Sequence, residues 1–211
     1  MASAHDHGPM AANEPVRVTQ KQLERKIERI ERDIRDDYGF RPNISDDITG
    51  LKRTSFSSLY DPITFERDDF WPARRLPAPA DPPEWTYPLS TINGADPPAR
   101  AQRYAGGSDL LLNVKSGGKV YRIEKGNRAA GTRSGVHIHD SGGITWILEG
   151  ADITLYAQGI SPTTFQERQR YYMPANTPMS ANNMSARDSE LMDLFVYPVG
   201  GSPITVLEPG Y

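Results

Sequence analysis

Two pairs of histidines are the residues whose spacing most directly indicates chemistry in this chain. The sequence has four histidines, and they form two His-x-His pairs, His5/His7 and His137/His139. Side chains two residues apart leave the same face of a β-strand, so two imidazoles in a strand can bind one metal ion without rearrangement of the backbone. Imidazole binds zinc, iron, nickel and copper. Each pair is therefore a candidate site for a divalent metal.

The two pairs lie in different kinds of sequence. Residues 1–15 are small and polar and lack an apolar period, which predicts a flexible tail around the first pair. An arm that crossed a folded site would add its histidines as ligands there, but we expect the tail to be solvated. The second pair lies in a run that is typical of a strand, so we take His137 and His139 as the candidate metal ligands.

Composition excludes several other kinds of function. Cysteine is absent, which removes disulfides, thiolate nucleophiles and cysteine-ligated metal sites. The 24 Lys and Arg against 27 Asp and Glu give a net charge of −3, which argues against a nucleic-acid partner bound by a basic surface. No stretch has the ~18 consecutive apolar residues of a membrane-spanning helix, and no secretory signal is recognisable, so we expect a cytoplasmic protein without a membrane partner.

The C-terminal half predicts many short β-strands. Apolar or alternating runs, each closed by Gly, Pro, Asn or Asp, recur from about residue 108. The predicted strands are residues 109–115, 119–124, 135–139, 144–149, 152–157, 170–173, 191–197 and 204–207. Short strands at regular spacing are typical of a sandwich or a barrel.

The N-terminal half predicts one helix, over residues 19–38. Thr19 is a suitable N-cap, and Gln22 three residues later completes a capping box. Apolar residues at a 4-3-4 spacing form one stripe along this helix, namely Leu23, Ile27, Ile30 and Ile34. We expect the stripe to pack on the rest of the domain, and a short coiled contact with a second subunit is the alternative.

Residues 41–100 have a different composition. They contain ten of the 18 prolines, so this segment is not expected to form part of a regular core. They also contain seven aromatic residues, whereas disordered linkers are poor in aromatics. We predict an ordered arm that lies across the folded body. The chain then divides into a tail (1–18), the helix and arm (19–100) and a barrel (101–211).

Residues 100–211 resemble the cupin superfamily through two motifs. The first motif is Gly, five residues, His-x-His, three or four residues, Glu, six residues and Gly, and four residues fall in register with it, namely Gly131, His137, His139 and Gly150. The second is Gly, five residues, Pro-x-Gly, two residues, His, three residues and Asn, which Pro174 and Asn183 match. The resemblance implies an all-β fold, the double-stranded β-helix or jelly-roll barrel, and a homodimer. Residues 1–100 show no such resemblance.

Two of the four metal ligands of the family are replaced in this chain. Gly143 stands where the first motif has its Glu, and Met179 stands where the second motif has its His. Two glycines of the second motif are also replaced, by Arg168 and Asn176. Asn is tolerated at a turn because it accepts a positive φ. The resemblance therefore leaves two of the four ligands in place.

Three interpretations of the site remain open. In the first, His137 and His139 hold a metal ion that is completed by water, by substrate or by a carboxylate such as Asp140 or Asp193. In the second, Met179 adds a thioether ligand, which favours copper. In the third, no metal binds and the two histidines act as acid–base or hydrogen-bonding groups.

Strand parity predicts which side chains line the site. If position 143 faces the interior, five side chains share that environment, namely Thr145, Ile147, Met179, Ala181 and Asn183. Their neighbours Ile144, Trp146 and Leu148 then face an outer layer, where Trp146 would contact the arm. Further residues expected in strands near the site are Tyr121, Arg122, Tyr171 and Tyr172. An inward Arg122 would hold a substrate carboxylate by two hydrogen bonds.

The histidine pair and the resemblance together predict a metal-dependent enzyme that acts on a small organic molecule. We favour an oxygenase in which a divalent ion (Fe, Mn, Ni, Zn or Cu) binds an organic acid or enol beside O₂. One alternative is a lyase or isomerase that uses the ion as a Lewis acid. The other is a cupin that binds a small ligand without catalysis.

Overall fold

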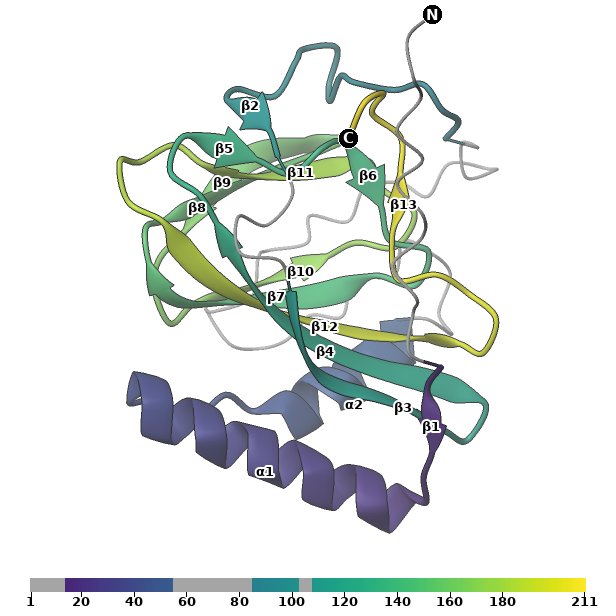
Figure 1. Cartoon of the computed structure of the whole chain (residues 1–211). Helices are drawn as coiled ribbons and strands as arrows, with labels where there is room; N and C mark the ends of the chain where they lie inside the picture. Colours follow the sequence, from purple (N-terminus) through teal and green to yellow (C-terminus); the bar gives the residue numbers. More distant parts are fainter. Residues whose placement is uncertain (1–13, 55–84, 103–107) are drawn as a thin grey trace, which may run out of the picture.

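Two β-sheets face each other, and two helices cover the outer face of one of them (Figure 1). The computed structural model describes residues 14–54, 85–102 and 108–211. His5 and His7 lie outside these residues. Within them, no helix is both long enough and apolar enough to cross a membrane.

The first sheet has six strands and carries the helices on its outer face. Its order is β1 (Val16–Arg17), β3 (Ser108–Ser116), β4 (Lys119–Arg128), β12 (Ser189–Pro198), β7 (Gly143–Gly150) and β10 (Arg170–Met173). All its pairs are antiparallel except β1 with β3. The central β12 lies between β4 and β7, which precede it by more than 30 residues in the sequence.

The second sheet lies opposite the first and contains the histidine pair. Its order is β13 (Thr205–Val206), β6 (His137–Ile138), β11 (Met179–Asn183), β5 (Thr132–Arg133) and β2 (Arg100–Ala101). β8 (Ile153–Ala157) also pairs with β11, and β9 (Ile160–Phe165) pairs with β8. Because the chain alternates between two facing, mainly antiparallel sheets, the predicted all-β double-stranded β-helix with an N-terminal helix is confirmed.

The predicted N-terminal helix is present as α1 (Gln20–Tyr38). Thr19 caps it with both hydrogen bonds of a capping box, and Gly39 ends it in a left-handed conformation. The four residues of its apolar stripe are buried together with residues of the first sheet. The stripe therefore packs within the chain, and the alternative of a coiled contact with a second subunit through this face is wrong.

A second helix, α2 (Ile44–Thr54), lies in the segment that the sequence predicted as an extended arm. Its interior contains no proline, and Pro42 lies before its first residue, so proline does not interrupt it. The buried carboxylate of Glu31 on α1 accepts hydrogen bonds from the backbone N–H groups of Ile44 and Ser45, which secures the first turn. The helix was not predicted because the ten prolines of 41–100 were taken as a property of the whole segment. Residues 55–84 of the predicted arm lie outside the described residues.

The described end of the arm, residues 85–102, lies along the second sheet. Leu89 N donates to Leu207 O at 2.8 Å, and β2 pairs with β5. The side-chain amide of Asn93 donates to the carbonyls of Ala157 and Ile160, each at 3.1 Å. These contacts attach the segment to the second sheet, which also carries the histidine pair.

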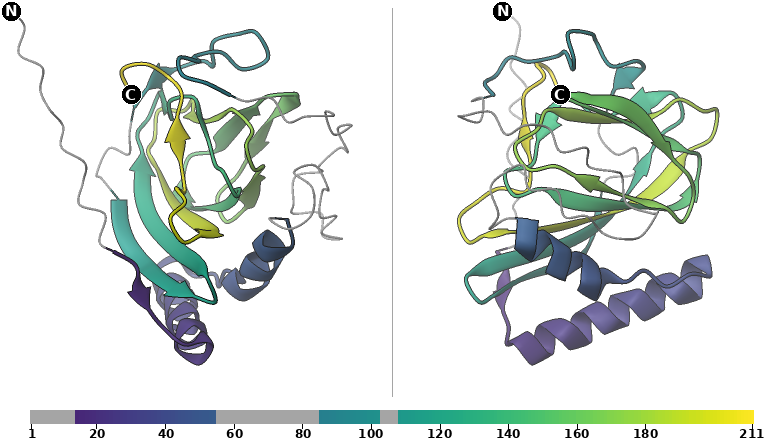
Figure 2. Two further views of the ribbon diagram at one scale, coloured as in Figure 1. Left: turned by 90° about the vertical axis from the view of Figure 1, so that its right-hand side faces the viewer. Right: turned by 180° about the vertical axis from the view of Figure 1, so that it is seen from behind.

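The side chains of β7 alternate between two hydrophobic layers. Ile144, Trp146 and Leu148 pack in the outer core between the first sheet and the helices, as parity predicts. Ile147 packs in the inner core between the two sheets. Figure 2 shows the helices restricted to the outer side of the first sheet. The inner face of this sheet is therefore directed at the second sheet and the histidines.

Trp146 contacts α2 through a buried charged group. Its indole Nε1 donates to Asp47 Oδ2 at 3.0 Å, and Arg170 Nε lies 3.2 Å from Asp47 Oδ1. The Arg170 guanidinium also lies over the indole ring, 4.6 Å from its centroid. Trp146 thus contacts the segment predicted as the arm, but this part of the segment is a helix and not extended chain.

Replacing Asp47 by Asn is expected to remove a pH dependence of stability. Burial raises the pKa of Asp47 from 3.8 to about 6, despite the opposing charge of Arg170. The folded state therefore binds this proton more tightly than the unfolded chain, and the contribution of the group to stability is lost as the pH rises from about 4 to about 6. The unfolding free energy of the wild type, relative to Asp47→Asn, should fall over this window by roughly 2–3 kcal/mol.

Urea unfolding followed by tryptophan fluorescence at several pH values measures this difference. Asp46→Asn is the matched control because Asp46 is an exposed neighbour on the same helix. Parallel pH profiles for the wild type and Asp47→Asn would contradict the assignment.

Candidate functional site

The two imidazoles of His137 and His139 lie side by side in the interior. Their Nε2 atoms are 3.1 Å apart, and the rings meet edge to face with centroids 4.8 Å apart. His137 Nδ1 lies 2.7 Å from Gly135 O, and His139 Nδ1 lies 2.7 Å from Pro203 O. A carbonyl oxygen only accepts hydrogen bonds, so each Nδ1 carries the hydrogen and each Nε2 presents a lone pair.

This arrangement fits a metal ion. Two nitrogen ligands about 2.1 Å from one ion, at angles of 90–109°, are about 3.0–3.4 Å apart, which brackets the observed separation. Two lone pairs this close repel each other unless a cation lies near both. Burial lowers the pKa of His137 to about 4 and that of His139 to about 3, so both rings are neutral near pH 7. A proton shared between the two Nε2 atoms therefore does not relieve the repulsion at this pH.

The position of the missing carboxylate is closed by packing. A Cβ atom on Gly143 would lie 2.6 Å from Met173 Cε and 2.8 Å from the Phe195 ring. Phe195 in turn stacks on His139, with centroids 5.0 Å apart. The space of a Glu side chain at position 143 is therefore taken by an apolar wall beside the imidazole.

Met179 occupies the other replaced ligand position. Its Cα is the cross-strand partner of His137 between β11 and β6, so the two side chains leave the same face of the sheet. Met179 is 1% exposed and belongs to the inner core. The thioether sulfur of Met179 would therefore be a weak, soft metal ligand beside the two imidazoles.

Neither carboxylate proposed from the sequence completes a metal cluster. Asp140 is exposed at the turn after His139. Asp193 is buried on β12, where its Oδ1 accepts a hydrogen bond from Thr145 Oγ1 at 2.6 Å. Among the described residues, no three His, Asp or Glu side chains gather where one ion could contact all of them. The described residues therefore offer two good nitrogen ligands, to which water or substrate would add others.

A row of polar side chains crosses the inner face of the first sheet. Tyr171, Thr145, Asp193 and Glu124 occupy successive cross-strand positions on β10, β7, β12 and β4. The pKa of the Tyr171 hydroxyl is raised, first by burial and then by the charge of Asp193. This row lies among the apolar side chains of the inner core.

Arg122 lies on the same inner face but is already paired. Its Nε and Nη2 both donate to Glu124 Oε2, at 3.0 and 2.6 Å. A substrate carboxylate would have to compete with Glu124 for this guanidinium, which the sequence did not indicate.

Other predicted residues have structural positions. Ile147 is fully buried in the inner core. The Asn183 amide donates to Arg128 O and Arg187 O at 3.0 and 2.7 Å, which shapes the turn after β11. Tyr121 and Tyr172 lie in the strands β4 and β10, as expected, but their side chains pack with the outer core and do not line the site.

Sequence reasoning missed Phe195 and Pro203. The alternation that places Asp193 inward would also have placed Phe195 inward, two residues along the strand. Pro203 contributes a backbone carbonyl, and no residue type marks such a role.

No protein-family model matches the sequence, and no curated protein matches it. One similar structure is a chain from the crystal structures of the DMSP lyases RdDddP and RnDddQII, with a TM-score of 0.36 and 16% identity over 41% of this chain and 43% of that chain. Another is a cupin-like protein from Thermotoga maritima, with a TM-score of 0.37 and 15% identity over 42% and 65% of the two chains.

A third similar structure is an RmlC-like cupin family protein with a double-stranded β-helix fold from Methanocaldococcus jannaschii. Its TM-score is 0.36, with 18% identity over 47% of this chain and 87% of that chain. The chain thus spans less than two thirds of the first two structures. Its own strand order and facing sheets give it a double-stranded β-helix fold.

Proposed function

We propose that this protein is a metal-dependent enzyme that acts on a small organic molecule. His137 Nε2 and His139 Nε2 would hold one divalent ion. The observation that carries the proposal is the 3.1 Å separation of these two Nε2 atoms, each in a ring whose Nδ1 is hydrogen-bonded to a backbone carbonyl.

The reaction class that we propose is an oxygenase. A divalent ion with two protein ligands supplies adjacent open positions for an organic acid or enol and for O₂. The stacked ring of Phe195 and the buried Met179 would exclude water around the imidazoles. Excluding water strengthens electrostatic interactions in the site and limits side reactions.

A lyase or isomerase is the second candidate, and the polar row on the first sheet favours it. Such reactions need a group that takes a proton from substrate. The carboxylate of Asp193, oriented by Thr145 Oγ1 at 2.6 Å, is the candidate proton acceptor. A cupin that binds a ligand without turnover would need neither the metal ion nor the proton acceptor.

Ligand screening with metal-free and metal-loaded protein tests these alternatives. Organic acids and enols that raise the melting temperature only after loading with Fe(II), Mn(II), Ni(II), Zn(II) or Cu(II) are candidate substrates. Oxygen uptake that requires both metal and ligand, and that His139→Ala abolishes, is the expected result. Turnover under argon would identify a lyase or isomerase, and ligand binding without turnover in air or argon would contradict an enzyme.

A further inference from the structure

We infer that the C-terminal segment, residues 203–211, positions both imidazoles and that Glu208 is the central positioning residue. This inference rests on the proposed function, because it concerns the same two histidines. One contact is direct, since His139 Nδ1 donates to Pro203 O at 2.7 Å. The other passes through Gly135, whose carbonyl accepts from His137 Nδ1.

Glu208 holds the residue between Gly135 and His137 in place. Its Oε2 accepts from Val136 N at 2.7 Å, while Leu207 N and Glu208 N donate to Val136 O at 2.9 and 3.1 Å. Both polar groups of the Val136 backbone are thus bound by the C-terminal segment. The peptide units on either side of Val136 are therefore fixed, which sets the direction of Gly135 O toward the imidazole of His137.

Arg133 completes the contact from β5. Its Nη1 and Nη2 donate to the two oxygens of Glu208 at 2.6 and 2.8 Å, and both side chains are nearly buried. Burial raises the pKa of Glu208, but the hydrogen bonds from Arg133 and Val136 outweigh it, so the pKa is lowered overall. Glu208 therefore accepts its hydrogen bonds as a carboxylate.

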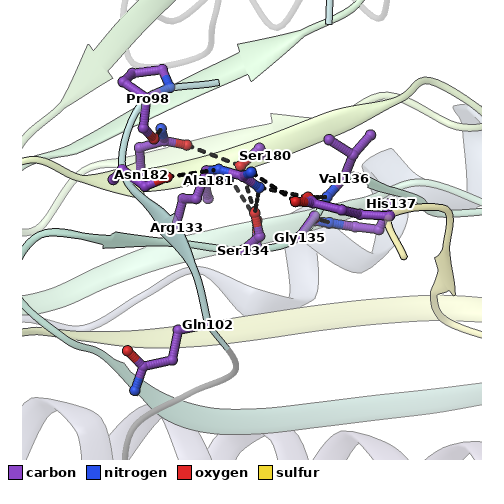
Figure 3. Close-up of polar contacts among 12 residues, drawn as sticks. Pro98, Gln102, Arg133, Ser134, Gly135, Val136, His137, Ser180, Ala181 and Asn182 are labelled. Atoms are coloured by element: carbon purple, nitrogen blue, oxygen red, sulfur yellow. Dashed lines mark hydrogen bonds and ion pairs between the residues drawn. The ribbon is translucent and has the colours of Figure 1, made fainter. Parts of the chain in front are cut away.

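Two further contacts enclose the same backbone. The Tyr211 ring lies where a side chain at Gly135 would be, because a Cβ atom there would clash with the atoms of this ring. On the other side, Ser180 Oγ donates to Ser134 O at 2.7 Å and Ala181 N donates to Ser134 Oγ at 2.8 Å (Figure 3). Residues 134–136 are thus held between β11 and the C-terminal segment.

This network acts on the imidazoles through their Nδ1 atoms. The partner of the second ring nitrogen fixes the tautomer and the direction of the lone pair that binds metal. Loss of such a partner typically lowers metal affinity by about 10–100-fold. Glu208 acts on His137 indirectly, through the backbone of Val136 and the carbonyl of Gly135.

Glu208→Gln is the test variant. Glutamine keeps the size of the side chain but turns an NH₂ group toward Arg133, so the bidentate pair is lost. Long-range ¹H–¹⁵N spectra of the metal-free protein at pH 7 should show both rings as the Nδ1–H tautomer in the wild type, and a mixture of tautomers for His137 in the variant. Titration with Co(II), followed by its visible absorption, should show an affinity lower by about 10-fold or more.

Glu31→Gln is the matched control. Glu31 also accepts two hydrogen bonds from an arginine, Arg41, at 3.1 and 2.7 Å and two from the backbone N–H groups of Ile44 and Ser45, but it does so in the helical layer. This variant should lower stability without changing the tautomers or the Co(II) affinity. If Glu208→Gln fails to fold, Tyr211→Ala is measured in the same way.

The outcomes separate this inference from the proposed function. Tautomers and Co(II) affinity that match those of Glu31→Gln would overturn the role of Glu208. A wild type that binds no divalent ion would overturn the proposed function, while the tautomer comparison would still decide whether Glu208 positions His137.

Discussion

Histidine in place of Met179 is expected to raise the affinity for Zn(II) by about 100-fold. Structural zinc sites with four ligands bind with about 10–16 kcal/mol, so one added ligand is worth roughly 3 kcal/mol, and 1.4 kcal/mol is a factor of ten. Residue 179 is the cross-strand partner of His137, so a third imidazole there leaves the same face of the sheet as the pair. The new side chain also replaces a buried one of similar size.

Competition with a chromophoric chelator measures this affinity in the wild type and in Met179→His. Met184→His is the control, because Met184 is exposed just after the same strand. It adds a histidine to the chain without adding one beside His137. Equal zinc affinities for Met179→His and Met184→His would contradict the proposed arrangement of the site.

Glutamate in place of Gly143 is expected to destabilise the protein without creating a metal ligand. Its Cβ atom would lie 2.6 Å from Met173 Cε and 2.8 Å from the Phe195 ring. Overpacking of a core costs about 1–3 kcal/mol, and burial of an unpaired carboxylate adds to this. We expect Gly143→Ala to lose about 1–3 kcal/mol and Gly143→Glu to lose more.

Chemical denaturation measures both variants, with Gly201→Ala as the control. Gly201 is exposed, and a Cβ atom there would approach its nearest neighbour, Pro198 O, to 3.2 Å. The stability losses of Gly143→Glu and Phe195→Ala should be less than additive in the double variant, since the second change removes one of the two groups that clash with the new side chain. A Gly143→Glu variant as stable as the wild type, with tighter zinc binding, would show that the carboxylate position is open.

Local sequence pattern accounts for much of the fold. The capping residues and apolar stripe of α1 lie close together in sequence, so their signal was sufficient to predict the helix. The alternation along β7 correctly separated outer from inner side chains. The strand β11 was not predicted because it contains Ser180, Asn182 and Asn183, which are typical of turns. In the fold, the polar side chains of this strand are buried and bonded to other backbone segments.

The candidate site was predicted only in part, because only some of its features are local in the sequence. The spacing of His137 and His139 is a local signal, and it correctly placed both on one face. The groups that orient them are backbone carbonyls of Gly135 and Pro203, and Pro203 is more than 60 residues along the chain. No side-chain type marks a carbonyl acceptor, and a contact at that separation depends on the whole topology.

The pairing of Arg122 was also beyond local pattern. Parity placed its guanidinium inward, but the same parity places Glu124 beside it, and the two neutralise each other. An inward charge is therefore a candidate for substrate binding only after its neighbours on the same strand have been considered.

The metal content of the purified chain, after loading with Fe(II), Mn(II), Ni(II), Zn(II) and Cu(II) separately and removal of excess ion, tests the central claim most directly. Elemental analysis should find about one ion per chain for at least one metal in the wild type. It should find none in His137→Ala/His139→Ala, with circular dichroism showing that this variant is folded. A wild type that retains no ion, or a double variant that retains as much as the wild type, would contradict the assignment of His137 and His139 as metal ligands.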